Sequence, residues 1–90
     1  MITRNYNDEP CFECTEDALN YALDIFDNPE EMKRLSIFRG QYMARFELEK
    51  KFGYPNPNYA SQIATTIQFF NECLSECDFI NRCCIRAKQQ

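Results

Sequence analysis

The sequence predicts an all-α protein, a three-helix bundle built on a long antiparallel helical hairpin, and three observations indicate it. Start and stop signals delimit a helix over residues 29–52, an apolar repeat of 3.5 residues runs through residues 58–88, and only two glycines occur in 90 residues. Tight β-turns commonly need glycine, so many hairpins are not expected. With 44% apolar residues, including eight Phe and five Tyr, the chain is predicted to fold as one domain over residues 1–90.

A shorter first helix is predicted to end near residue 27, and its start has two alternatives. Five apolar residues repeat here at helical spacing, namely Ala18, Leu19, Ala22, Ile25 and Phe26. Thr15 can cap a helix that begins at that point, and Asp8 can cap a longer helix over residues 9–27. The apolar pattern does not distinguish the two.

The second helix has the clearest boundaries. Asn28 is a favourable N-cap, Pro29 fits the first helical position, and Glu31 completes the spacing of a capping box. At the other end, Gly53 suits the left-handed residue that follows a last turn, and Pro55 prevents continuation. A helix over residues 29–52 is therefore predicted.

This second helix has two apolar faces. One face contains Met32, Leu35, Phe38, Tyr42 and Phe46, and the weaker second face contains Ile37, Ala44, Leu48 and, at its edge, Phe52. Two apolar faces predict a central helix that packs on both sides, against other helices or a partner. The N-terminal segment is expected to cover one face, and any part that it leaves exposed is the predicted binding surface.

The third helix, over about residues 58–88, is capped by Asn56 or Asn58. Its seam resembles a coiled coil, with Ala60, Ile63, Ile67, Phe70, Leu74, Cys77, Asn81 and Cys84 at alternating spacings of three and four. Asn81 can fix the register or remain hydrated at a frayed end. Because this helix is longer than the second, its end is predicted to extend beyond it by about two turns, over the first inter-helix turn or toward a partner.

Composition argues against catalysis and membrane insertion. The chain lacks His, the residue best suited to proton transfer near neutral pH, so we expect a protein that is not an enzyme. No apolar run reaches the length of a membrane span, and the N-terminus lacks the apolar core of a signal peptide. We expect a cytoplasmic protein with reduced thiols, located in the host cytoplasm if a phage encodes it.

Six cysteines are the main candidates for a metal or redox site. Cys11 and Cys14 form a CxxC, and Cys73 and Cys77 form a CxxxC, so one hypothesis is a zinc site with these four cysteines as ligands. The favoured interpretation makes Cys73, Cys77 and Cys84 small apolar residues of the packing stripe. Disulfides between the first and last helices are a further alternative. A thioredoxin-like redox role for the CxxC needs a preceding strand, and because no strand is predicted before Cys11 this role is not expected.

Charge is distributed unevenly along the chain. Residues 1–31 contain nine acidic residues against Arg4, and residues 32–54 contain six basic residues against two acidic ones. The acidic third can imitate a nucleic acid or dock into a basic groove. The basic residues are spread around their helix, so no stripe that could follow phosphates is formed, and nucleic-acid binding is not expected.

These features favour a non-catalytic module for protein–protein interaction that binds a larger partner. Acidic Glu13, Glu16 and Asp17 and the off-seam aromatics Phe69 and Phe79 are the predicted contact residues. By analogy with small acidic accessory proteins of phages and mobile elements, the expected effect on the partner is inhibition. A homodimer is compatible with the pattern. The alternative function is a small helical domain that is stabilised by zinc on four cysteines or that binds nucleic acid.

Overall fold

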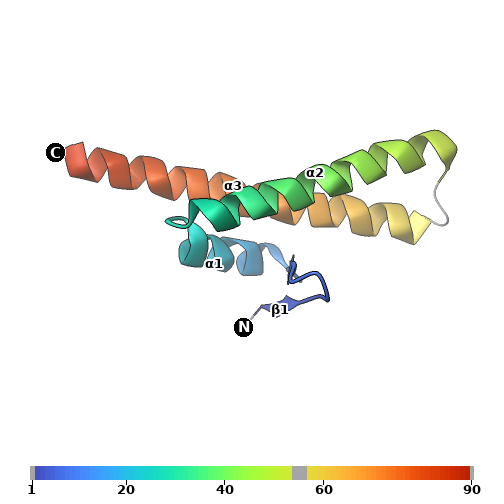
Figure 1. Cartoon of the computed structure of the whole chain (residues 1–90), viewed down its shortest axis with the longest axis horizontal. Helices are drawn as coiled ribbons and strands as arrows, with labels where there is room; N and C mark the ends of the chain where they lie inside the picture. The colour runs from blue at the N-terminus through green and yellow to red at the C-terminus, as the bar shows by residue number, and fades with distance from the viewer. Residues whose placement is uncertain (1, 54–56, 90) are drawn as a thin grey trace.

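The computed structural model describes residues 2–53 and 57–89, and side chains for residues 2–53 and 58–83. Two short strands, β1 (Thr3–Arg4) and β2 (Pro10–Cys11), precede three helices, α1 (Thr15–Ile25), α2 (Pro29–Phe52) and α3 (Pro57–Gln89) (Figure 1). The predicted all-α three-helix bundle with a short N-terminal helix is confirmed. None of the described helices is long and apolar enough to cross a lipid bilayer.

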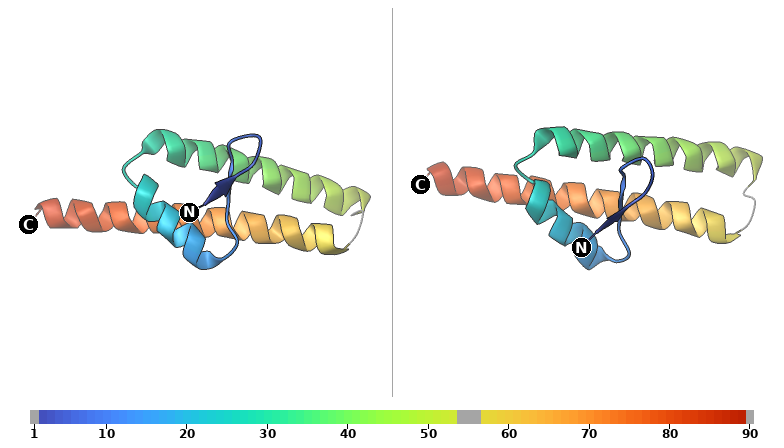
Figure 2. Two further views of the ribbon diagram at one scale, coloured as in Figure 1. Left: turned by 90° about the horizontal axis from the view of Figure 1, so that it is seen from below. Right: turned by 60° about the horizontal axis from the view of Figure 1, so that its bottom comes forward.

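The helix at the centre of the bundle is α3. Both α1 and α2 pack extensively on α3 but touch each other little. Figure 2 shows α2 and α3 side by side, with α1 laid obliquely over α3. The prediction that the second helix is central is therefore wrong: α3 covers only one face of α2, and α1 packs mainly on α3, while the β-hairpin reaches α2 through its loop.

The boundaries of α2 follow its sequence signals. The Asn28 side chain accepts a hydrogen bond from the backbone N–H of Glu31 at 3.2 Å, and Pro29 occupies the first turn. Gly53 ends the helix with a φ of 88°, a conformation that favours glycine. The next helix begins at Pro57, so Asn58 lies inside it and does not cap it, while Asn56, the other predicted cap, lies outside the described residues.

Of the two predicted starts for the first helix, the structure has the one near Thr15. The N-cap residue is Cys14, in an extended conformation and without a side-chain capping bond, so the prediction of Thr15 as the cap is wrong by one position. The longer helix over residues 9–27 is also wrong, because Pro10 and Cys11 form β2. The helix ends at Ile25, two residues earlier than predicted.

The β-hairpin was not predicted. Thr3 pairs with Cys11 and Arg4 pairs with Pro10 in antiparallel register. The connecting loop is held by Asn5, whose side-chain oxygen accepts hydrogen bonds from the backbone N–H groups of Asn7 and Glu9 at 2.9 and 3.1 Å. Asp8 adopts a φ of 59°, a left-handed conformation that Asp tolerates better than most residues. Hydrogen bonds to the Asn5 side chain, together with the left-handed Asp8, thus form this turn without glycine.

The aromatic part of the core surrounds Phe70 of α3, which is fully buried. Its ring lies 5.8 Å from that of Phe12, 6.4 Å from Phe38 and 6.0 Å from Tyr42, measured between centroids. These rings belong to the segment after β2 and to α2, so one side chain joins both to α3. Aromatic contacts of this kind add to the free energy gained by burial.

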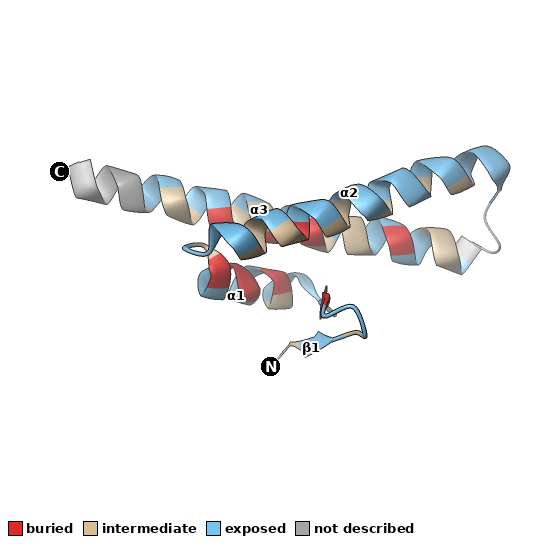
Figure 3. Ribbon diagram, in the orientation of Figure 1, coloured by how far each residue is buried: buried red, intermediate tan, exposed pale blue. Residues whose placement is uncertain are grey.

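Small side chains let α1 lie close to α3. Ala18 and Ala22 on α1 and Cys73 and Cys77 on α3 are completely buried (Figure 3). Further along α3, the Asn81 amide donates a hydrogen bond of 2.9 Å to the carbonyl of Phe26, the C-cap of α1. Asn81 is therefore hydrogen-bonded to α1 and is not simply hydrated, as one of the two predicted roles had it; its role in fixing the register stays a prediction. The end of α3 extends beyond the first turn of α2, as its greater length predicts (Figure 1).

Two alanine substitutions on α2 should show that its covered face contributes more to stability than its exposed face. Leu35 is fully buried and Ile37 is 51% exposed. Leu35→Ala leaves a cavity and should lower the free energy of unfolding by about 2–4 kcal/mol. Ile37→Ala should change it by less than about 1 kcal/mol. Urea denaturation followed by circular dichroism measures both, and equal losses would contradict the packing described.

Candidate functional site

A network of polar side chains joins the β-hairpin, α1 and α2. The Arg4 guanidinium donates to the Tyr21 hydroxyl at 2.7 Å, and this hydroxyl donates to Glu31 at 2.7 Å. Arg34 donates two hydrogen bonds to the Glu31 carboxylate, at 2.9 and 2.7 Å. Arg4 and Arg34 both donate to the carbonyl of Asp8, at 3.0 and 2.7 Å. The hairpin loop is thereby fixed to the start of α2.

The protonation of this network fits a structural role. The Arg34 guanidinium hydrogen-bonded to Glu31 lowers the pKa of that carboxyl below its ordinary 4.5. Burial, and then the hydrogen bond to Glu31, raise the pKa of Tyr21 above its ordinary 10.0. Near neutral pH the carboxylate is therefore charged and the phenol protonated. Neither group exchanges a proton in the range where general acid–base catalysis works.

The four cysteines proposed as zinc ligands occupy two different environments. Cys11 and Cys14 are exposed, at β2 and before α1, whereas Cys73 and Cys77 are buried in the core. Within the described part of the chain, no group of three or more Cys, His, Asp or Glu side chains is arranged to hold a metal ion. The structure therefore does not bring the predicted ligand set together.

Cys73 and Cys77 have the surroundings of core residues. Burial raises the pKa of Cys73 to about 12 and also raises that of Cys77. The Cys77 thiol lies 3.8 Å from the carbonyl of Ala22 on α1. A nucleophilic or metal-binding cysteine needs a stabilised thiolate, which is the opposite shift. These two positions fit the interpretation as small apolar residues of the packing stripe.

The predicted contact residues lie at separate places. Glu13 and Glu16 are exposed at the start of α1, where the half-buried Asp17 accepts a hydrogen bond from the backbone N–H of Glu13 at 3.1 Å. Phe69 is half-buried and lines a cavity of about 140 Å³ with Glu9 to Phe12, so the hairpin segment covers it. Phe79 is 57% exposed on α3.

The outer face of α2, the weaker of its two predicted apolar faces, carries several exposed apolar side chains. Ile37, Leu48 and Phe52 are 51%, 60% and 80% exposed, and neighbouring Met43 is 49% exposed. The predicted contact residues did not include these side chains, although their helical spacing and the rule that an uncovered face is the binding surface both indicated them. We call the row Ile37, Gly40, Ala44 and Leu48 the outer row of α2.

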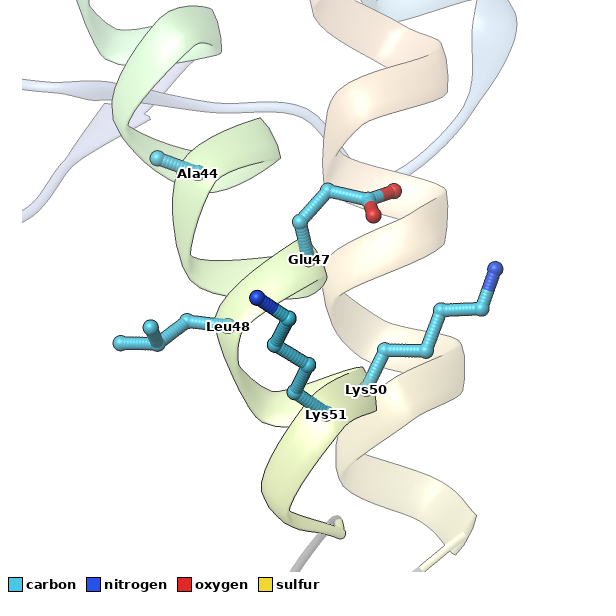
Figure 4. Close-up of a pocket in the computed structure, with 5 residues that line it drawn as sticks. All are labelled: Ala44, Glu47, Leu48, Lys50 and Lys51. Carbon is cyan, nitrogen blue, oxygen red and sulfur yellow. The ribbon is translucent and has the colours of Figure 1, made fainter.

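The outer row includes a shallow groove near the end of α2. Ala44, Glu47, Leu48, Lys50 and Lys51 line about 480 Å³ of open space. Figure 4 shows Ala44 and Leu48 directed to the same side of α2, away from α3, with the Lys51 side chain extending beside them. The groove combines an apolar floor with charged edges, which suits binding of a side chain or helix better than catalysis.

Comparison with known proteins adds no relationship: the chain matches no family model, no curated protein and no solved structure.

Thiol labelling should distinguish the two cysteine environments. In a Cys84→Ser background, an aromatic disulfide reagent should label the exposed Cys11, Cys14 and Cys83 within the mixing phase. Cys73 and Cys77 should react at least about 100-fold more slowly, since they require local opening of the core. Five equally fast thiols would contradict the packing of α1 on α3.

Acid titration should report on the Glu31 network. Because the pKa of Glu31 is lowered on folding, its stabilisation is present above pH 4.5 and is lost as the pH falls through the folded pKa. Wild type should therefore lose stability more steeply than Glu31→Gln between pH 7 and about pH 3. Asp24→Asn, which changes an exposed carboxylate away from a helix N-terminus, is the control and should follow wild type. Parallel curves for wild type and Glu31→Gln would rule out this contribution.

Proposed function

We propose that the protein is a non-catalytic interaction module that binds and modulates a larger protein through the outer face of α2. The observation that supports this is the exposure of Ile37, Leu48 and Phe52 on a helix whose other face is already packed on α3. Singly exposed apolar residues are ordinary on protein surfaces, but a row along one helix face is typical of an interaction site.

The chemistry of the described groups favours binding over catalysis. The phenols of the buried Tyr21 and the half-buried Tyr42 and the buried thiols of Cys73 and Cys77 have raised pKa values, so they remain protonated near neutral pH. The clearest carboxylate–arginine pair, Glu31 with Arg34, is used to fix the hairpin loop. By analogy with small accessory proteins of phages and mobile elements, we propose that binding inhibits the partner.

The acidic start of α1 is the second candidate contact surface. Glu13 and Glu16 are exposed there, and Leu19 and Leu23 follow on α1 at 37% and 58% exposure. Acidic groups at a helix N-terminus also stabilise the helix itself, so this surface has a structural explanation that the outer face of α2 lacks. We therefore assign the main contact to α2.

Affinity capture from the source cells, followed by mass spectrometry, tests the proposal with matched variants. Ile37→Gln/Leu48→Gln should lose a protein that wild type captures, by at least about tenfold in affinity once that protein is purified. Leu19→Gln/Leu23→Gln makes the same chemical change on α1 and should keep it. Glu13→Lys/Glu16→Lys examines the acidic surface separately. Identical capture by wild type and by the α2 variant would overturn the assignment, as would a turnover activity.

A further inference from the structure

We propose that a second copy of this chain occupies the outer face of α2, as an antiparallel α2–α2 pair with its two-fold axis near residue 42. The inference goes beyond the proposed function: it shares only the premise that this exposed face is a binding surface, and a second copy and the larger protein would compete for it. A two-fold interface requires a surface that is complementary to itself, with each residue facing a different residue of the other copy. The outer row of α2 has this property.

The order of side-chain sizes along the outer row reads the same in both directions. Ile37 and Leu48 are the large residues at its ends, and Gly40 and Ala44 are the small residues between them. Spacings of three, four and four residues keep all of them on one side of a helix. When two such helices run antiparallel about residue 42, Gly40 comes level with Ala44 of the other copy, and Ile37 with its Leu48.

The centre of the row allows a close approach of two helices. A Cβ placed on Gly40 would meet no atom within 4 Å, and Ala44 is exposed one turn later. Small residues four apart let two helix backbones come together, while larger residues on either side pack around the crossing. The groove beside Ala44 and Leu48 would then accept Ile37 of the other copy (Figure 4).

Charged residues of both signs lie at the two ends of the row. Glu30 and Lys33 lie at one end of α2, and Glu47 and Lys51 at the other. Among the described residues, these four form no ion pair within the chain. The two-fold axis brings Glu30 near Lys51 and Lys33 near Glu47 of the other copy. Lys33 also comes level with Lys51, so the apolar row, rather than charge, carries the affinity.

An antiparallel pair fits the residues of the outer face of α2 better than a parallel pair does. Parallel helices would place Lys50 and Lys51 beside the same lysines of the other copy and would align the two helix dipoles. An antiparallel pair instead extends Phe52, which is 80% exposed, over the first turn of the opposite α2. One helix pair is smaller than a standard protein interface, so the expected dissociation constant is about micromolar.

Sedimentation of the purified full chain tests the pairing. Wild type should pass from monomer to dimer between about 1 µM and about 300 µM. A Cβ at position 40 meets no atom of its own chain within 4 Å, so Gly40→Leu should fold normally, and its side chain should block the close approach at the crossing and weaken the dimer at least about tenfold. Leu23→Gln, on α1, should dimerise like wild type. A wild-type protein that is monomeric throughout overturns the inference, as does an unaffected Gly40→Leu.

Disulfide trapping tests the orientation, with Cys11, Cys14, Cys83 and Cys84 replaced by Ser. Gln41→Cys lies beside the two-fold axis and should give a covalent dimer on oxidation. Ile37→Cys and Leu48→Cys should each cross-link poorly alone and well when mixed, because the two positions face each other. Efficient cross-linking of Ile37→Cys alone would indicate a parallel pair and contradict the proposal.

The two proposals fail in different ways. A monomeric wild type whose captured protein is still lost in Ile37→Gln/Leu48→Gln overturns the self-pairing and supports the interaction module. A dimer that is lost in Gly40→Leu, together with capture that no α2 variant changes, supports the self-pairing and overturns the assignment of the larger partner to this face.

Discussion

The burial of Phe70 is the interaction on which the arrangement of the other elements depends. Its ring contacts Phe12 from the segment after β2, and Phe38 and Tyr42 from α2. Because this side chain is fully buried, neither α2 nor the N-terminal segment can leave without exposing it to water. The small buried residues one and two turns further along α3 then define the groove in which α1 lies.

The same arrangement explains why one face of α2 is uncovered. Since α1 packs mainly on α3, it makes few contacts with α2. These contacts combine the shared apolar core, to which α2 contributes Leu35, with the hydrogen bonds that link Tyr21, Glu31 and Arg34. In the described residues no further helix remains to cover Ile37 and Leu48. The exposed face is therefore a consequence of the packing of α1 on α3, and the binding role that we propose would use this face.

The sequence predicted the elements with strong local signals and missed those that depend on distant contacts. The cap at Asn28 and the seam around Phe70 were found because one turn, or one helical repeat, determines them. The hairpin was missed because its strands have two residues each and its turn uses Asn5 and Asp8 in place of glycine. The turn residues between Asn5 and Pro10 were the available signal. No pattern among neighbouring residues predicts the hydrogen bond from Arg4 to Tyr21. The same is true of the central position of α3.

The packing of α1 on α3 has a consequence for the synthesis of the protein on the ribosome. The bonds that attach α1 join residues 55 positions apart, Ala22 to Cys77 and Phe26 to Asn81. At ribosomal rates of about 5–20 residues per second, α1 waits about 3–10 s for its partner to be translated. During that interval the buried side chains of α1 lack their packing partners on α3. The last helix to be made completes the burial of the first.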